Sequence, residues 1–237
     1  VDEMPPFLVS VVSSADHWLF VSSAGGLTAG RVSPETALFP YVPADRVHEC
    51  SPHTGCRTIL RLDLQGRQVL WEPFNREHDG RFATSRHLYK SLLGHKLRFE
   101  EVNHDLALAF RYTWATSDRH GFVRLCELQN LGDETLRVDL VDGLQNILPA
   151  GTPMVVQKNS SNLVDAYKWS ELDAGTRLAR YALYSRISDR AEPSESLRAH
   201  VVYGLGLDAP TVLLSSLQLR DFRLGHPVAQ EDRKRGI

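Results

Sequence analysis

The sequence predicts an all-β protein built as an antiparallel sandwich or barrel. Three observations support this expectation: apolar residues alternate with polar ones at period two, short strand-like runs recur throughout, and helical periodicity is sparse. About a dozen runs follow one another at roughly the 8–12-residue spacing that is typical of sandwiches and barrels. No strand–helix–strand rhythm and no longer repeat is evident, which disfavours parallel α/β sheets, propellers and solenoids.

The clearest strand is LALAFRYTW, residues 106–114. Successive side chains of a strand point to opposite sides of the sheet, so this run has one apolar face. That face consists of Leu106, Leu108, Phe110, Tyr112 and Trp114. Downstream, FVRLCELQN (122–130), the turn LGDE and TLRVDLVDG (135–143) read as two strand-like runs joined by a short Gly/Asp turn, which predicts a hairpin.

The same pattern predicts strands elsewhere in the chain. Three further hairpins are expected, joining residues 17–23 to 27–32, 56–64 to 67–74, and 97–102 to 106–114. Three later apolar runs, rich in β-branched and aromatic residues, predict additional strands at 176–187, 197–207 and 211–219.

Helical signal is confined to one or two short stretches. Residues 85–96 carry Leu88, Leu92 and Leu93 at helical spacing, with Gly94 near the end as a stop signal. A helical turn is also expected after Pro193.

A single domain is expected, because no low-complexity linker divides the chain. The sandwich should occupy residues 17–225, preceded by an N-terminal extension over 1–16. Residues 226–237 are strongly polar and are interpreted as a tail or the start of a linker.

The amino-acid composition of the chain limits the classes of partner that it is expected to bind. Lys and Arg number 27 against 29 Asp and Glu, so the formal net charge is −2 and the basic excess of a nucleic-acid binder is missing. No apolar run approaches the ~20 residues that span a bilayer. The N-terminus does not resemble a signal peptide, and three cysteines are too few for a disulfide framework. We therefore expect a cytoplasmic protein with neither nucleic acid nor membrane as partner.

The segment VHECSPHTGC, residues 47–56, gathers four potential zinc ligands: His48, Cys50, His53 and Cys56. Structural zinc sites usually draw their ligands from two separated turns, and one short loop closes a tetrahedron with difficulty. Pro52 and Gly55 favour an ordinary turn before the next strand. A structural loop is the favoured interpretation, with a metal site and a Cys50–Cys56 disulfide as alternatives.

The sequence contains no dinucleotide fingerprint, phosphate-binding loop, nucleophile elbow or HExxH motif, and we expect no cofactor. Sugar chemistry would require two carboxylates at a fixed separation, or a histidine and a carboxylate as acid and base. The candidate carboxylates are Glu100, Glu101, Asp105, Asp118, Glu127, Asp139 and Asp142. The candidate histidines are His87, His95, His104, His120 and His200. None lies in a recognisable motif, so solvated charge is favoured for the carboxylates and an ordinary surface or core position for the histidines.

Aromatic side chains are a second route to sugar recognition. Trp114 continues the apolar face of its strand and is expected in the core, whereas Trp169 lies among polar neighbours in DAYKWSEL and is the better candidate for an exposed platform.

Three motifs between residues 114 and 149 resemble the N-terminal β-sandwich of carbohydrate-active enzymes of the cellobiose phosphorylase type. They are W-x-x-S-D (Trp114, Ser117, Asp118), G-F-V-R (Gly121 to Arg124) and D-G-L-Q-N-I-L-P (Asp142 to Pro149). The similarity covers most of residues 17–225 and includes SSAGGLTAGRVSPETALFPY and ALYSRISDRAEPSESL.

The resemblance implies a large two-sheet antiparallel supersandwich of the galactose mutarotase-like kind. In that family the sandwich packs on a downstream (α/α)₆ barrel, which holds the catalytic acid, and it often forms dimer contacts. By this resemblance the chain carries no catalytic residue itself. Its partners would be the barrel of the same polypeptide, a second copy, and a carbohydrate. The candidate sugar contacts are Trp169, Trp114, Asp118 and Arg119.

Three functions therefore stay open. A non-catalytic packing, oligomerisation or sugar-contact domain should expose an apolar patch where the barrel docks. A stand-alone mutarotase or epimerase should hold a histidine and a carboxylate in one concave pocket. A carbohydrate-binding module should present an exposed aromatic platform.

Overall fold

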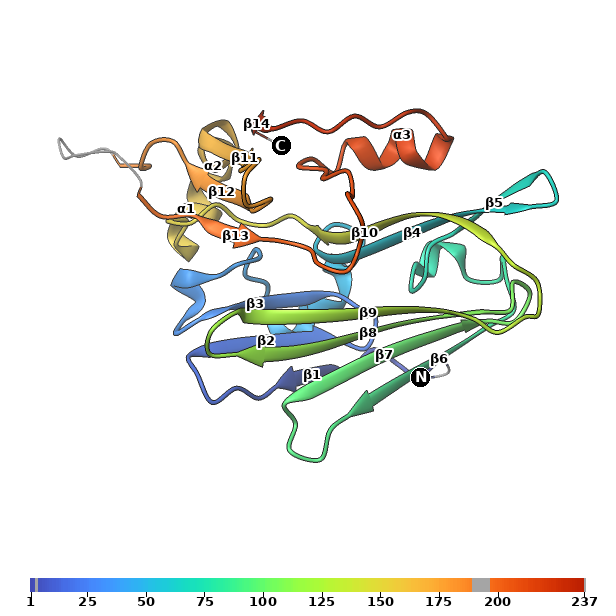
Figure 1. The fold of residues 1–237 in the computed structure, drawn as a ribbon. Helices are drawn as coiled ribbons and strands as arrows, with labels where there is room; N and C mark the ends of the chain where they lie inside the picture. Colours follow the sequence, from blue (N-terminus) through green and yellow to red (C-terminus); the bar gives the residue numbers. More distant parts are fainter. Residues whose placement is uncertain (3, 189–196, 237) are drawn as a thin grey trace.

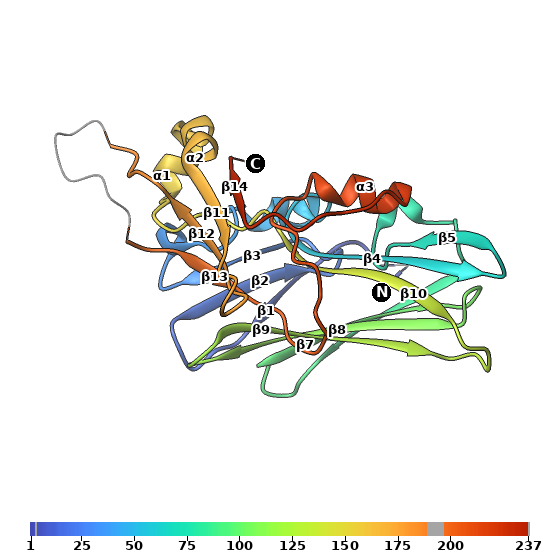
Figure 2. The same cartoon turned by 45° about the horizontal axis from the view of Figure 1, so that its top comes forward.

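Two antiparallel sheets face each other across the hydrophobic core in the computed structural model, which describes residues 1–2, 4–188 and 197–236 (Figure 1). The four-stranded sheet has the order β6-β7-β8-β9, and its strands are β6 (Thr84–Lys90), β7 (Lys96–Asn103), β8 (Leu108–Ser117) and β9 (Gly121–Asn130). The three-stranded sheet has the order β10-β4-β5, and its strands are β10 (Arg137–Gln145), β4 (Gly55–Leu64) and β5 (Arg67–Trp71). Figure 2 shows the two sheets as stacked layers. The predicted all-β sandwich is confirmed.

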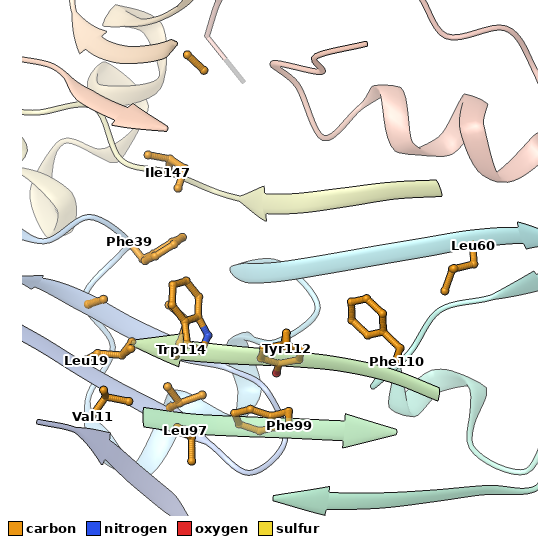
Figure 3. Close-up of a cluster of buried hydrophobic side chains, with 14 of the residues drawn as sticks. Val11, Leu19, Phe39, Leu60, Leu97, Phe99, Phe110, Tyr112, Trp114 and Ile147 are labelled. Atoms are coloured by element: carbon orange, nitrogen blue, oxygen red, sulfur yellow. The ribbon is translucent and has the colours of Figure 1, made fainter. Parts of the chain in front are cut away.

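The alternation along β8 builds the centre of the core. Phe110 and Tyr112 are each 2% exposed and Trp114 is 1% exposed, and their side chains lie between the sheets (Figure 3). Phe99 of β7 stacks on Tyr112 with ring centroids 4.8 Å apart. Full burial of a large apolar side chain stabilises the fold by about 1.5–3 kcal/mol, so this face of β8 contributes strongly to folding. The sequence prediction for this strand is confirmed, and Trp114 is a core residue.

Two further sheets contain the remaining described strands. The first has the order β1-β2-β3 and consists of β1 (Leu8–Val11), β2 (His17–Ser22) and β3 (Leu27–Arg31). The second has the order β13-β12-β11-β14 and consists of β11 (Lys168–Leu172), β12 (Ala179–Leu183), β13 (His200–Val202) and β14 (Arg233–Arg235). The described strands are thus divided among four sheets, and the sandwich is formed by β6-β7-β8-β9 and β10-β4-β5. Strand β1 lies in the expected N-terminal extension and β14 in the expected polar tail, so both segments pair with the domain.

Helices are few and short among the described residues. The α-helices are α1 (Met154–Asn159), α2 (Ser161–Tyr167) and α3 (Gln218–Leu224), and the 3₁₀ turns are η1 (Pro34–Thr36), η2 (Ala44–Cys50) and η3 (Arg76–His78). In Figure 1, α3 lies over the β10-β4-β5 sheet, while α1 and α2 lie beside the C-terminal sheet. Within the described residues, no helix has the length and apolar character needed to cross a membrane. The helical turn expected after Pro193 falls on residues outside the described part.

The helix predicted over residues 85–96 is wrong. Residues 85–90 belong to β6, which pairs antiparallel with β7 and places Leu88 opposite Phe99. Leu92 and Leu93 lie in the β6–β7 turn and are 101% and 77% exposed. The helical spacing of the three leucines therefore does not define an apolar helix face, because only Leu88 packs against the core.

The hairpin predicted between residues 122–130 and 135–143 is also wrong. Strand β9 pairs with β8, whereas β10 pairs with β4 over nine register positions from Arg137↔Asp63 to Gln145↔Gly55. The chain therefore crosses from one sheet to the other between β9 and β10. The hairpins β2–β3, β4–β5 and β7–β8 form as predicted.

The late apolar runs are less regular than expected. The run 197–207 contains only the three-residue strand β13, and the run 211–219 contains no strand and leads into α3. Ser215 is one cause, since its Oγ accepts a hydrogen bond from the Leu217 backbone N–H at 3.3 Å. Such local side-chain bonds satisfy the backbone without a neighbouring strand.

Candidate functional site

The segment 47–56 is a structural turn. His48 and Cys50 lie on the 3₁₀ turn η2, and the Cys50 thiol donates to the Val47 carbonyl at 3.1 Å. His53 is exposed, and Cys56 lies at the start of β4. Cys50 and Cys56 are both free thiols. Across the described ranges, no three His, Cys, Asp or Glu side chains are grouped so that they could hold a metal ion.

The two candidate tryptophans have different surroundings. Trp114 is buried between the two sheets of the sandwich, so its ring has almost no surface in contact with solvent. Trp169 of β11 is half-buried and lies beside two guanidinium groups of β14: Arg233 and Arg235 are 5.1 and 4.7 Å from its ring centroid. Guanidinium groups at this distance attract the negative face of an indole ring. The ring of Trp169 thus already has cationic partners within the chain.

Asp118 and Arg119 lie at the exposed β8–β9 turn. The Ser14 hydroxyl donates to Asp118 Oδ1 at 3.4 Å, and the Arg119 backbone N–H donates to Ser117 Oγ at 3.3 Å. Within the described residues no hydrogen bond, ion pair or ring contact joins either side chain to Trp169 or Trp114. The structure does not bring the four candidate sugar contacts together.

The candidate histidines are distributed over several surfaces. His87 lies opposite Glu100 on the β6–β7 ladder, but Glu100 accepts from Arg111 and, at 3.1 Å, from the Tyr89 hydroxyl. Burial raises the pKa of Glu100, and these bonds outweigh it and lower the pKa below its ordinary value. His200 Nδ1 bonds the Leu148 carbonyl at 2.7 Å. Within the described ranges, none of the five histidines hydrogen-bonds a candidate carboxylate.

Two of the quoted motifs meet between the facing sheets, within strands β9 and β10. Arg124 of G-F-V-R forms a bidentate ion pair with Asp142 of D-G-L-Q, with N–O distances of 2.8 and 2.9 Å. Thr58 of β4 donates to Asp142 Oδ1 at 2.6 Å, and the guanidinium lies 5.0 Å from the Tyr112 ring centroid. The Arg124 side chain is only 7% exposed.

This inter-sheet bridge links β9 to β10 at the position where the sequence predicted a hairpin. Bidentate pairs of guanidinium and carboxylate combine strength with directionality, and both partners here have further contacts. Burial raises the pKa of the adjacent Cys56 thiol, so this sulfur is neutral and weakly nucleophilic near pH 7. The bridge is thus a contact between the two facing sheets that leaves neither charge unpaired.

A second candidate carboxylate is buried within the sandwich. Glu101 is 1% exposed and accepts from the Trp71 indole at 2.9 Å, the Phe74 backbone N–H at 2.7 Å and Arg86 Nε at 2.7 Å. The expectation of a solvated role is wrong for this residue. The sequence held a signal, because Glu101 shares strand parity with the buried Phe99.

Glu72 is a buried carboxylate that the sequence analysis missed. It follows β5, accepts from Arg223 Nε and Nη2 at 2.5 and 2.9 Å, and lies 3.4 Å from Arg57 Nη1. Burial raises the pKa of its carboxyl, but the two arginines outweigh burial and lower the pKa below its ordinary value. Arg223 belongs to α3, so this pair attaches the C-terminal helix to the sheet. No local pattern could reveal a partner 151 residues away.

One segment exposes apolar side chains while remaining attached to the core. Val202, Val212 and Leu214 pack against the central cluster. We term residues 197–207 the C-terminal apolar segment. Its exposed apolar side chains are Leu197, Val201, Tyr203, Leu205 and Leu207. Leu197 and Leu205 are 97% and 87% exposed. A monomer rarely leaves large neighbouring apolar side chains in water, so this segment is the strongest candidate for a contact surface.

A scan against protein-family models finds no match to this chain, and a search of curated proteins finds none either.

Proposed function

We propose that this chain is a non-catalytic β-sandwich domain of a larger carbohydrate-active protein. In this proposal it packs against a catalytic body of the same polypeptide, and the resemblance of its motifs implies that this body is a helical barrel. The observation that carries the proposal is the C-terminal apolar segment, because a docking domain is expected to expose apolar side chains where its partner sits.

The arrangement of the segment supports a docking role. Its core contacts at Val202, Val212 and Leu214 hold the backbone in place, while Leu205 and Leu207 point away from the core. A partner would meet a segment that is already tethered to the sandwich, so binding would order fewer degrees of freedom than it would in a free chain, which favours association. Tyr203 is further restrained by a hydrogen bond of 3.1 Å between its hydroxyl and His120 Nδ1.

The test compares this chain alone with a polypeptide extended by the coding sequence that adjoins it. The double variant Leu205→Ser/Leu207→Ser should change the free energy of unfolding of the chain alone by less than about 0.5 kcal/mol, because both side chains are exposed. In the extended polypeptide the same variant should loosen the interdomain contact, measured as faster proteolysis between the two bodies.

The matched control is Leu92→Ser/Leu93→Ser, which removes two equally exposed leucines from the β6–β7 turn. It should leave the interdomain contact unchanged. Equal loosening by both double variants, or by neither, would contradict the proposed docking surface. The chain alone could instead form a concentration-dependent dimer that Leu205→Ser/Leu207→Ser abolishes. In that case the partner on this surface is a second copy of the chain and not the barrel.

The non-catalytic assignment has its own test. The chain alone should show no hydrolysis, phosphorolysis or mutarotation of disaccharides and monosaccharides. Turnover that is lost in a histidine or carboxylate variant would overturn it.

A further inference from the structure

The outer face of the β10-β4-β5 sheet holds a groove that none of the sequence motifs identified. The groove has a volume of about 480 Å³ and is bordered by α3 along one side. Ligand sites commonly occupy about 300–1,000 Å³, so this volume suits a small molecule of one or two sugar rings. We term it the arginine groove, and its charged lining residues are Arg61, Asp63, Arg81, Arg137, Asp139 and Arg223.

Charge in the arginine groove is opposite to that of the chain. Four guanidinium groups and two carboxylates line the groove, and Glu72 pairs with Arg223 behind it, so the local formal charge is +1, whereas the whole chain carries −2. The four arginines come from β4, β10, α3 and the β5–β6 connection, so folding alone brings them together. A concave surface with one dominant sign raises the local concentration of ligands of opposite charge.

Two of the arginines form the rigid wall of the groove. Arg223 is held by its bidentate bond to Glu72. Arg61 donates to Asp139 Oδ2 at 3.0 Å and to the Phe222 carbonyl at 3.2 Å, and its guanidinium lies 5.2 Å from the Phe222 ring centroid. These contacts fix α3 on the sheet, so the groove exists before any ligand arrives.

The other two arginines have donors to spare. Arg137 is exposed, and its guanidinium makes no hydrogen bond or ion pair with another described residue, although its register partner on β4 is Asp63. Arg81 stacks on the neighbouring Phe82 ring at 5.5 Å. A guanidinium presents a planar fork of N–H donors that matches a carboxylate or a phosphate.

The carboxylates of the groove add acceptors next to these donors. Arg137 and Asp139 are on one face of β10, directly opposite Asp63 and Arg61 of β4, so positive and negative side chains alternate across the floor. A sugar hydroxyl both donates and accepts, and such an alternating surface can satisfy both capacities. Gln68 and Leu70 extend the lining along β5.

We propose that the arginine groove binds an acidic saccharide, a polyhydroxy ring that carries a carboxylate or a phosphate. The acid group pairs with Arg81 and Arg137, and the hydroxyls bond Asp63, Asp139 and Gln68. This inference rests on the proposed carbohydrate-related function and assigns a ligand class to a surface separate from the C-terminal apolar segment.

Titration calorimetry with the whole chain tests the assignment. The probes are glucuronate and glucose 6-phosphate for the two acid groups, glucose as the neutral counterpart, and inorganic phosphate as the acid group without a sugar. At least one acidic sugar should bind, at least about tenfold more tightly than glucose and than inorganic phosphate, and its affinity should fall with added salt.

Variants locate the site. Arg81→Gln/Arg137→Gln should weaken the acidic sugar by about tenfold or more, and Asp63→Asn should weaken it less. The control Arg98→Gln removes an exposed arginine from the outer face of the other sheet and should leave binding unchanged. Arg81 and Arg137 are both exposed, and their replacement should preserve the thermal unfolding midpoint.

Each contrary result overturns a distinct statement. Glucose binding that equals that of the acidic sugars and ignores the arginine variants would overturn the acidic ligand while leaving a carbohydrate-related role intact. Inorganic phosphate binding as tightly as glucose 6-phosphate would overturn the saccharide. Absence of binding by every probe would overturn the groove assignment, and the docking role would still stand or fall on the Leu205→Ser/Leu207→Ser experiment.

Discussion

The two facing sheets of this chain bury many apolar side chains between them, whereas the C-terminal region leaves several apolar side chains exposed. Between residues 55 and 145, long strands pair over seven to ten residues, except for the shorter β5, and bury many of their inward side chains. From residue 146 onward, strands are three to five residues long, and apolar side chains such as Leu197 and Leu205 face water. The first region supplies most of the central core, whereas the second combines a few core contacts with exposed apolar surface.

The buried ionic contacts follow the same division. The Arg124–Asp142 bridge joins two long strands within the sandwich. The Glu72–Arg223 pair instead attaches a C-terminal helix to the sheet from outside. One contact joins the two sheets of the sandwich, and the other adds to the contacts that hold the C-terminal region on it.

The largest difference between the regions should appear on removing a tryptophan from each. Trp114→Ala should lower the free energy of unfolding by about 3–5 kcal/mol, because it leaves a cavity between the sheets. Trp169→Ala should cost about 1–2 kcal/mol, since its half-buried ring loses mainly its arginine contacts. Urea denaturation of both variants measures the two values. Equal losses would remove the distinction between an enclosed and a peripheral region.

A smaller effect is expected at the inter-sheet bridge. Arg124→Ala should cost about 3 kcal/mol, at the lower end for a broken buried ion pair, because Asp142 keeps partial contact with water. The double variant Arg124→Met/Asp142→Leu should recover much of that loss by removing the uncompensated charge. Equilibrium unfolding of both variants decides the point. A double variant as unstable as Arg124→Ala would show that the bridge itself, rather than charge compensation, is needed for packing.

The smallest expected effect is a pH dependence of the free energy of unfolding, caused by Glu72, which helps to attach α3 to the sheet. The pKa of Glu72 is lower in the folded chain than in the unfolded chain, so its stabilisation is present above the unfolded pKa of about 4.3 and is lost as the pH falls through the folded pKa. Glu72→Gln should therefore be destabilising at pH 7, and its difference from the parent chain should shrink toward pH 3.

Unfolding free energies at pH 7, 5 and 3 measure this trend, with Glu49→Gln as the exposed control. Glu49 pairs only with Arg46 on the surface, so its replacement should have little effect at any pH. A difference between Glu72→Gln and the parent that stays constant from pH 7 to pH 3 would contradict the role of the Glu72 charge.

The sequence was most informative where structure is local. Period-two alternation located β8, and short turns identified the β2–β3, β4–β5 and β7–β8 hairpins, because neighbouring strands pair through contacts close in sequence. Even the burial of Glu101 follows from its parity with Phe99.

The pairing of segments that are far apart in the sequence could not be predicted in the same way. Nothing local distinguishes a turn that closes a hairpin from a connection that crosses between sheets, so the pairing of β10 with β4 was missed. The leucines of residues 88–93 match helical spacing, but pairing with β7 overrides that weak local preference. The four arginines of the groove come from four separate segments, and they become neighbours only in the folded chain.

Hydrogen exchange of backbone amides tests the central contrast most directly. In the chain alone, amides of β8 should exchange only through global unfolding, while those of β13 should exchange far faster through local opening. In the extended polypeptide, protection of β13 and of residues 203–207 should rise, and that of β8 should stay the same. Protection of β13 equal to that of β8 in the chain alone, or unchanged in the extended polypeptide, would contradict the account of the C-terminal region as a docking surface.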